Sequence, residues 1–192
     1  ATGRPAPAAV SGTTTSDGDE NDRQMENGRI LRDNTYGTIA EDALRRDFTV
    51  NALYYNIADF SLIDYADGLE DIKAGRLRLI GDPEQRYRED PVRMLRAVRF
   101  ACKLGFTIDP KSEEPLFRLA QLLADIAPAR LFDELIKLFH SGYGLGVFEK
   151  LRQYGLFGHL FPATEACLAR EDHGFPITFV SRGLANTDTR LH

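Results

Sequence analysis

Apolar residues recur every three or four positions from residue 84 to residue 161, which is the spacing of one face of an α-helix. Proline stands near the start of some of these segments and glycine near the end, as at Pro128 and Gly105. We therefore expect the second half of the chain to be all-helical. The predicted helices span residues 84–88, 91–104, 113–125, 128–141, 145–154 and 156–161.

The pattern before residue 81 mixes helical and strand-like segments. Thr38 and Glu41 have the spacing of a capping box, which predicts a helix from Thr38 to Arg45. Apolar and aromatic runs over residues 52–57 and 61–64 predict a β-hairpin. The predicted fold class is therefore α+β, with a short mixed sheet before the helices. A short helix over residues 69–74 and a strand over residues 76–80 complete this part.

Composition adds limits to this picture. The chain has 192 residues and is 43% apolar, enough for a real core, and its net charge of −5 argues against uniform coating by nucleic acid. The sequence has no run of about 18 apolar residues, so we expect no membrane span. We also see no signal peptide, which would show a basic region followed by an apolar one. Cys102 and Cys167 form neither a disulfide framework nor a metal motif, so we expect a cytoplasmic protein. Residues 1–28 are expected to be a flexible loop or tail, because they carry almost no large apolar residue.

The stretch YREDPVRMLRAVRFACK, residues 87–103, predicts an amphipathic helix. Asp90 suits its N-cap and Pro91 its first position. Arg93 and Arg96 lie opposite the apolar side, with Asp90 at the edge next to Arg93. The apolar side is formed by Met94, Leu95, Val98, Ala101 and Cys102.

Charge along this stretch is reversed relative to the whole chain. Six basic residues stand against two acids between Arg86 and Lys103. One interpretation is a solvated helix face, on which Asp90 caps the helix and pairs with Arg93 for about 0.2–0.5 kcal/mol. The other interpretation is recognition of a nucleotide base.

Hydrogen-bond polarity supports the second interpretation. A carboxylate only accepts hydrogen bonds and a guanidinium only donates them. Adenine presents an amine donor beside a ring-nitrogen acceptor, and cytosine does the same, whereas guanine and uracil present the reverse order. Asp90 and Arg93 together could thus select A or C over G or U, without separating A from C.

Three blocks of the sequence resemble one family. EDPVRMLRAVRFACKLGF is similar to the EDxxR helix of the class II tRNA nucleotidyltransferase and bacterial poly(A) polymerase family. RRDFTVNALYYN, residues 45–56, resembles the family's RRDFTxNA motif, and IDYADGLEDIKAGRLRLIGDP, residues 63–83, resembles the segment that joins the two. The blocks stand in the family's order, and the resemblance covers roughly residues 31–161.

The resemblance implies a fold and a set of site residues. It implies part of a nucleotidyltransferase head over residues 29–81, a helical neck over 82–162 that binds nucleotide and RNA, and the start of an incomplete helical body over 163–192. Asp47 is the implied catalytic residue. Nucleotide contacts are implied for Arg46, Asn51, Asp90, Arg93 and Arg96, and RNA or phosphate contacts for Arg45 and Arg99.

Mg²⁺ is the cofactor that the resemblance implies. In the family a Gly-rich turn is followed by a DxD pair whose carboxylates hold the metal ions, and here Asp17-Gly18-Asp19 and Asp188 are poor matches to that pair. We therefore expect the metal ligands to lie mainly outside this sequence, with Asp47 as the one candidate inside it. The isolated chain is expected to be inactive.

The functional expectation follows from these residues. The leading hypothesis is a template-independent enzyme that adds AMP from ATP to RNA 3′ ends, as a poly(A) polymerase does. The alternatives are a CCA-adding tRNA nucleotidyltransferase, or a non-catalytic module that binds RNA or nucleotide. ATP and an RNA 3′ end are the expected partners, no membrane is expected, and protein partners are unknown.

Overall fold

The computed structural model describes residues 24–26, 29–32, 38–170 and 174–191. The chain divides into residues 1–37 and residues 38–192, and each unit is described by itself. In the first unit, β1 (Gln24–Glu26) pairs antiparallel with β2 (Arg29–Arg32). The predicted tail, residues 1–28, lies outside the described residues apart from β1.

The second unit begins with the predicted capping box. The Thr38 backbone N–H donates to Glu41 Oε2 at 2.7 Å, and the Glu41 backbone N–H donates to Thr38 Oγ1 at 3.3 Å. These bonds satisfy donors that the first turn of a helix leaves free. Helix α1 (Ile39–Arg45) follows, as predicted, and a 3₁₀ turn, η1 (Thr49–Asn51), comes after it.

The predicted hairpin is also confirmed. Strand β3 (Leu53–Asn56) pairs antiparallel with β4 (Ser61–Asp64), with Tyr54 opposite Ile63. The connecting turn is held by side chains, because Asp59 Oδ1 accepts from the Ser61 backbone N–H at 3.0 Å. Helix α2 (Gly68–Lys73) follows the hairpin.

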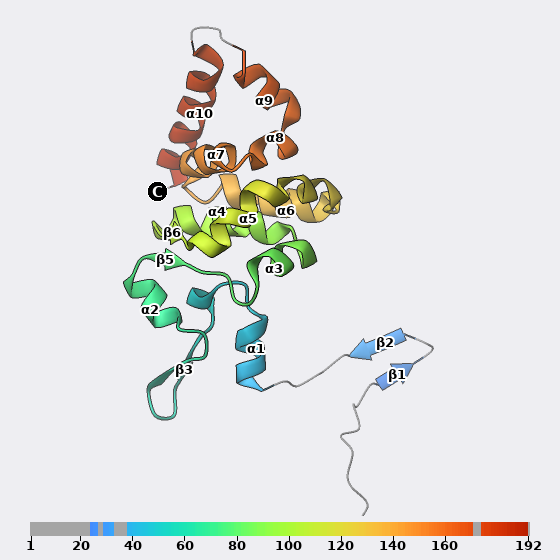
Figure 1. Ribbon diagram of the computed structural model, residues 1–192, viewed down its shortest axis with the longest axis vertical. Helices are drawn as coiled ribbons and strands as arrows, with labels where there is room; N and C mark the ends of the chain where they lie inside the picture. The colour runs from blue at the N-terminus through green and yellow to red at the C-terminus, as the bar shows by residue number, and fades with distance from the viewer. Residues whose placement is uncertain (1–23, 27–28, 33–37, 171–173, 192) are drawn as a thin grey trace, which may run out of the picture. The chain divides into compact units, whose positions relative to one another are not determined.

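The predicted strand over residues 76–80 is wrong in length and in partner. Strand β5 contains only Arg76–Leu77 and pairs in parallel with β6 (Thr107–Ile108) from the helical part, while Leu79 forms an isolated bridge to Phe48. Gly105, at φ +66°, ends the preceding helix and turns the chain back beside β5. The described residues therefore hold three separate two-stranded sheets instead of one head sheet (Figure 1).

Helices make up the rest of the described chain, largely as predicted. The predicted helix 113–125 begins earlier, at Pro110 behind the Asp109 cap, and its second half is a 3₁₀ segment. Two helices, α9 and α10, lie after residue 161, where the periodicity predicted none. The helices are α3 (Pro83–Glu89), α4 (Val92–Leu104), α5 (Pro110–Leu119), η2 (Ala120–Asp125), α6 (Pro128–Phe139), α7 (Gly144–Gln153), α8 (Leu156–Leu160), α9 (Pro162–Leu168) and α10 (Phe175–Leu191).

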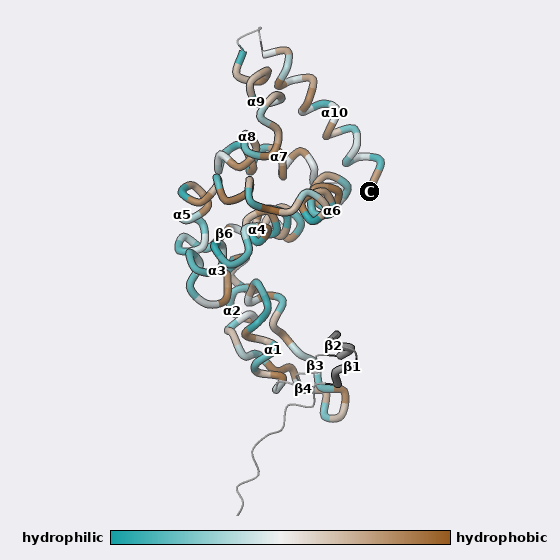
Figure 2. Tube along the Cα trace, turned by 90° about the vertical axis from the view of Figure 1, so that its right-hand side faces the viewer, coloured by the Kyte–Doolittle hydropathy of each residue, from teal (hydrophilic) through white to brown (hydrophobic). Residues whose placement is uncertain are grey.

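Helix α4 carries the centre of the core. Met94, Leu95, Val98 and Ala101 are at most 1% exposed, and Cys102 is half-buried against the same cluster. Apolar and polar positions alternate along the helices in Figure 2, as expected when each helix buries one face. Within the described residues, no helix is both long enough and apolar enough to cross a membrane.

A side chain of α10 caps the start of α7. Asp188 accepts from the backbone N–H groups of Gly144 at 2.7 Å and Leu145 at 2.9 Å. A carboxylate at a helix N-terminus satisfies free backbone donors there. This contact ties α10 to α7.

Candidate nucleotide-binding site

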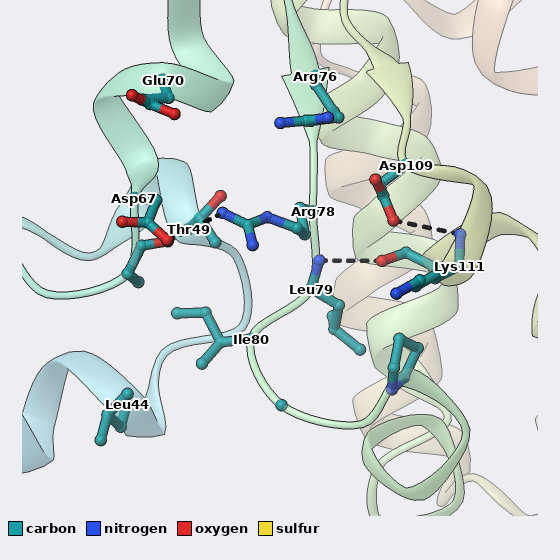
Figure 3. A pocket seen from close by; sticks show the side chains of 14 residues that line it. Leu44, Thr49, Asp67, Glu70, Arg76, Arg78, Leu79, Ile80, Asp109 and Lys111 are labelled. Atoms are coloured by element: carbon teal, nitrogen blue, oxygen red, sulfur yellow. Dashed lines mark hydrogen bonds and ion pairs between the residues drawn. The ribbon is translucent and has the colours of Figure 1, made fainter.

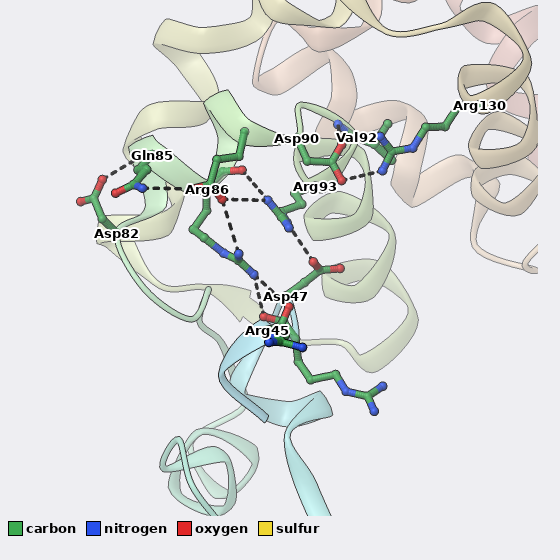
Figure 4. Close-up of polar contacts among 11 residues, drawn as sticks. Arg45, Asp47, Asp82, Gln85, Arg86, Asp90, Val92, Arg93 and Arg130 are labelled. Carbon is green, nitrogen blue, oxygen red and sulfur yellow. Dashed lines mark hydrogen bonds and ion pairs between the residues drawn. The ribbon is translucent and has the colours of Figure 1, made fainter. Parts of the chain in front are cut away.

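Arg45, Arg46 and Asp47 lie where α1 ends. Arg46 is the C-cap residue and has an extended backbone, so the chain leaves the helix there. Arg86 Nη2 donates to the carbonyl oxygens of Arg45 at 3.1 Å and Arg46 at 2.9 Å (Figure 4). The Ile80 backbone N–H donates to the Asp47 carbonyl oxygen at 2.9 Å. Segments about 40 residues away thus fix the path of this turn.

An open depression of about 520 Å³ lies at the same turn. Phe100 is the one lining residue that the sequence did not single out. The structure therefore brings five predicted site residues to one place. The depression is lined by Arg45, Arg46, Asp47, Asn51, Arg96 and Phe100.

The Asp47 carboxylate lies between two arginines of α4. Arg93 Nε is 2.9 Å from Oδ1 and Arg96 Nη2 is 2.8 Å from Oδ2, and the Asp47 side chain is 12% exposed. Arg93 and Arg96 are three apart on one helix face, so a single carboxylate can bridge them. Both carboxylate oxygens are thus engaged by cationic donors.

Asp90 and Arg93 do not pair through their side chains. Asp90 Oδ2 accepts from Arg130 Nη2 at 2.6 Å, and Oδ1 accepts weakly from the Val92 backbone N–H at 3.3 Å (Figure 4). Arg93 Nη1 donates to the Arg86 carbonyl oxygen at 2.9 Å, besides its bond to Asp47. The predicted N-cap is therefore wrong: Asp90 is the C-cap of α3, and α4 begins at Val92 after the N-cap residue Pro91, with no side-chain cap.

Comparison with known sequences agrees with the three blocks. Residues 10–78 match the family model described as the poly A polymerase head domain, and residues 105–168 match the one described as the probable RNA and SrmB-binding site of polymerase A. Poly(A) polymerase I of Escherichia coli O157:H7 is 52% identical over 183 residues, which are 95% of this chain and 38% of that protein.

The chain belongs to the poly(A) polymerase and tRNA nucleotidyltransferase family. Poly(A) polymerase I of Haemophilus influenzae is 53% identical over 169 residues, or 88% of this chain and 37% of the relative. The CCA-adding enzyme of Levilactobacillus brevis is 48% identical over 101 residues, or 53% of this chain and 25% of the relative. The chain thus spans well under half the length of these relatives.

Solved structures of the family share the fold. The CCA-adding enzyme of Bacillus stearothermophilus, in complex with CTP, has a TM-score of 0.58 and 38% identity, covering 62% of this chain and 30% of that one. The Thermotoga maritima CCA-adding enzyme, complexed with a tRNA, has a TM-score of 0.59 and 34% identity, covering 65% and 31%. The predicted nucleotidyltransferase fold and its helical extension are thereby confirmed.

Arg99, for which an RNA contact is predicted, is more buried than Arg46 and Arg96. Its Nε donates to Glu134 Oε1 of α6 at 2.9 Å, its side chain is 15% exposed, and its guanidinium lies 4.6 Å from the centre of the Phe100 ring. Glu134 is buried, so this pair ties α4 to α6. The RNA contact of Arg99 stays a prediction.

The buried carboxylate of Asp71 holds together the segment between the hairpin and α3. Asp71 is fully buried and accepts from Thr49 Oγ1 at 2.7 Å, Arg76 Nε at 2.7 Å and Arg78 Nε at 2.8 Å. Burial by itself raises the pKa of the Asp71 carboxyl, but the hydrogen bonds from Thr49 and the two arginines lower it by more. The pKa of Asp71 is therefore below its ordinary value. Figure 3 shows Thr49 and Arg78 at a neighbouring pocket of about 590 Å³.

Sequence reasoning missed the residues that hold the site from other elements. Arg86 fixes the α1 turn, Arg130 holds Asp90, and Glu134 holds Arg99. Charge spacing predicts ion pairs only three or four residues apart on one helix. These contacts span 35 to 40 residues, so no local signal indicates them.

Proposed function

We propose that the protein carrying this chain is a template-independent RNA nucleotidyltransferase that adds AMP from ATP to RNA 3′ ends. The convergence of Arg46, Asp47, Asn51 and Arg96 in one depression carries this proposal. The extent of the match to poly(A) polymerase I, over 95% of the chain, favours AMP addition over CCA addition.

The triphosphate of ATP binds at Arg46 and Arg96 in this proposal. Their side chains are 50% and 35% exposed, and guanidinium groups bind phosphate oxygens through paired N–H donors. Arg45 and Asn51 are both exposed at the same depression. In the proposal, Arg45 binds an RNA phosphate and Asn51 contacts the nucleotide.

The base lies against the start of α4. Asp90 Oδ1 makes only one long hydrogen bond, so it has room to accept from the adenine amine. Arg93 donates from Nε and Nη1 to protein groups and offers Nη2 to the adenine ring nitrogen. Guanine and uracil present an acceptor to Asp90 and a donor to Arg93, so the same two groups exclude these bases.

Mg²⁺ does not fit Asp47 as the structure arranges it. Both oxygens of that carboxylate accept from guanidinium groups, which repel a further cation. Among the described residues, no group of three or more acids, histidines or cysteines could hold a metal ion. Asp47 therefore has no metal-binding role in this arrangement; in the proposed enzyme, Mg²⁺ binds mainly to carboxylates other than Asp47.

The remaining assignments rest on the family match. Residues 29–81 belong to the head, 82–162 to the neck and 163–192 to the body, with the RNA 3′ end reaching the neck. Cys102 and Cys167 are both free thiols, which suits a cytoplasmic location.

Primer extension tests the proposal. A full-length family member that carries this segment is incubated with Mg²⁺ and an oligo(A) primer or a tRNA without its CCA end, with each nucleotide alone and with ATP and CTP together. Long AMP tracts on the primer support the proposal. Addition that stops after two C and one A on the tRNA indicates a CCA-adding enzyme, and binding of ATP without extension indicates a non-catalytic module.

A further inference from the structure

Arg46 is held by a carboxylate one helical turn before it. Asp42 Oδ2 accepts from Arg46 Nη2 at 2.7 Å and from the Tyr54 hydroxyl at 2.6 Å. Asp42 lies on α1 and Tyr54 on β3, so the contact joins the helix to the hairpin. Neither residue was among the predicted site residues.

Packing holds the Tyr54 side chain in place. Its side chain packs against the small core cluster of Ala43, Ala52 and Ile80. Its ring also meets Tyr65 edge-on, with the ring centres 6.2 Å apart and the planes at 71°. A ring held on two sides places its hydroxyl in one position, which orders the Asp42 carboxylate and, through it, Arg46.

The protonation of the pair agrees with this geometry. The hydrogen bond from Tyr54 lowers the pKa of the Asp42 carboxyl, and the bond from Arg46 lowers it as well. The same hydrogen bond to Asp42 raises the pKa of Tyr54, so Tyr54 keeps its proton and stays a donor at neutral pH.

We propose that Asp42 and Tyr54 are positioning residues that aim Arg46 at the triphosphate of the incoming nucleotide. This inference rests on the function proposed above. Asp42 engages Arg46 Nη2, and a guanidinium has further N–H groups that can donate to phosphate oxygens. A guanidinium held at one nitrogen needs less ordering when the nucleotide binds.

A plain surface ion pair predicts a different outcome. Exposed pairs four residues apart contribute little, and the Asp42 charge by itself repels a triphosphate. Removal of Asp42 would then strengthen ATP binding, or leave it unchanged. Positioning predicts the opposite sign, because Arg46 loses its orientation. Tyr54→Phe is the cleaner test, since it removes one hydroxyl and no charge.

The experiment measures KM for ATP and kcat in primer extension by a full-length family member carrying this segment. Tyr54→Phe should raise KM about three- to tenfold with little change in kcat, as expected for one lost hydrogen bond. Tyr55→Phe is the matched control, because Tyr55 neighbours Tyr54 but is 59% exposed and lies on the other face of the strand. Asp42→Ala should raise KM at least as much.

A double-mutant cycle separates positioning from general destabilisation. In an Arg46→Ala background, Tyr54→Phe should no longer change KM, because its effect passes through Arg46. An unchanged KM in Tyr54→Phe, a tenfold effect that persists without Arg46, or a lower KM in Asp42→Ala would each overturn the inference. Absence of extension by the unmodified enzyme would instead overturn the proposed function.

Discussion

The Asp90→Ala substitution separates base recognition from a purely structural role of Asp90 before α4. In the structure the Asp90 side chain makes two contacts, one with Arg130 Nη2 at 2.6 Å and one with the Val92 backbone N–H at 3.3 Å. Alanine removes both contacts. It also removes the acceptor that the proposed function assigns to the adenine amine.

The expected stability cost of Asp90→Ala is small. The bond to the Val92 backbone N–H is long, so its loss should cost no more than the low end of the roughly 0.5–2 kcal/mol that is typical of a helix cap. Arg130 is 58% exposed, so water solvates its guanidinium once the pair is broken, and that loss is at most about 1 kcal/mol. The variant should therefore fold.

The expected effect on nucleotide choice is larger. A hydrogen bond to a charged acceptor is worth about 1.5–3 kcal/mol, which is roughly ten- to a hundredfold in relative kcat/KM. ATP use should fall by this factor. GTP and UTP use should hold or rise, because Arg93 still offers a donor to their acceptors.

The assay is kcat/KM for all four nucleotides in a full-length family member with this segment, beside the Tm of each variant. Arg130→Ala is the control, because it breaks the same ion pair but keeps the Asp90 carboxylate. Equal losses for all nucleotides in Asp90→Ala, with an unchanged ATP/GTP ratio, would refute base recognition and leave Asp90 with a structural role only.

Three further substitutions test the scaffold by denaturant and thermal unfolding of the 192-residue chain. Asp71→Ala should lower the free energy of unfolding by about 3 kcal/mol, because it leaves three donors without their buried acceptor; a loss below about 1 kcal/mol would contradict this. The folded-state pKa of Asp71 is lowered, so its contribution is complete above its unfolded pKa and disappears as the pH falls. Asp71→Ala should therefore flatten the decline of Tm below about pH 4. Gly68→Ala should cost at least about 2 kcal/mol, since the new Cβ overlaps the Thr49 carbonyl oxygen, and a variant as stable as the wild type would disprove the overlap. Asp188→Ala should cost about 1 kcal/mol by uncapping α7, and no change in Tm would show that water replaces the carboxylate.

Local sequence patterns predicted most elements of the fold. The capping box at Thr38, the hairpin and the apolar side of α4 depend on residues within a few positions of one another. Such short-range preferences act before the rest of the chain is placed. The local patterns predicted no helix after residue 161. Helix α10 lies there without a fully buried residue, so little apolar periodicity is needed to place it.

Pairing between distant segments could not be predicted in the same way. Residues 76–80 alternate like a strand, yet only Arg76 and Leu77 form a strand, and they pair with residues 107–108. Leu79 forms only an isolated bridge to Phe48, and its backbone N–H donates to Ser112 Oγ at 3.1 Å. Alternation reports which face of a segment is buried, but it carries no information about the partner.

The same limit applies to the charge of α4, and it changes how the arginines there should be interpreted. The excess of basic residues between residues 86 and 103 suggests a phosphate-binding face when that stretch is counted alone. In the fold, however, Asp47 engages Arg93 and Arg96, and Glu134 engages Arg99, and both acids lie outside the counted stretch. Much of the local positive charge is therefore compensated inside the protein. A free phosphate contact follows better from an arginine that keeps exposed, unengaged donors, and Arg46 at the end of α1 meets that condition more fully than Arg99 does.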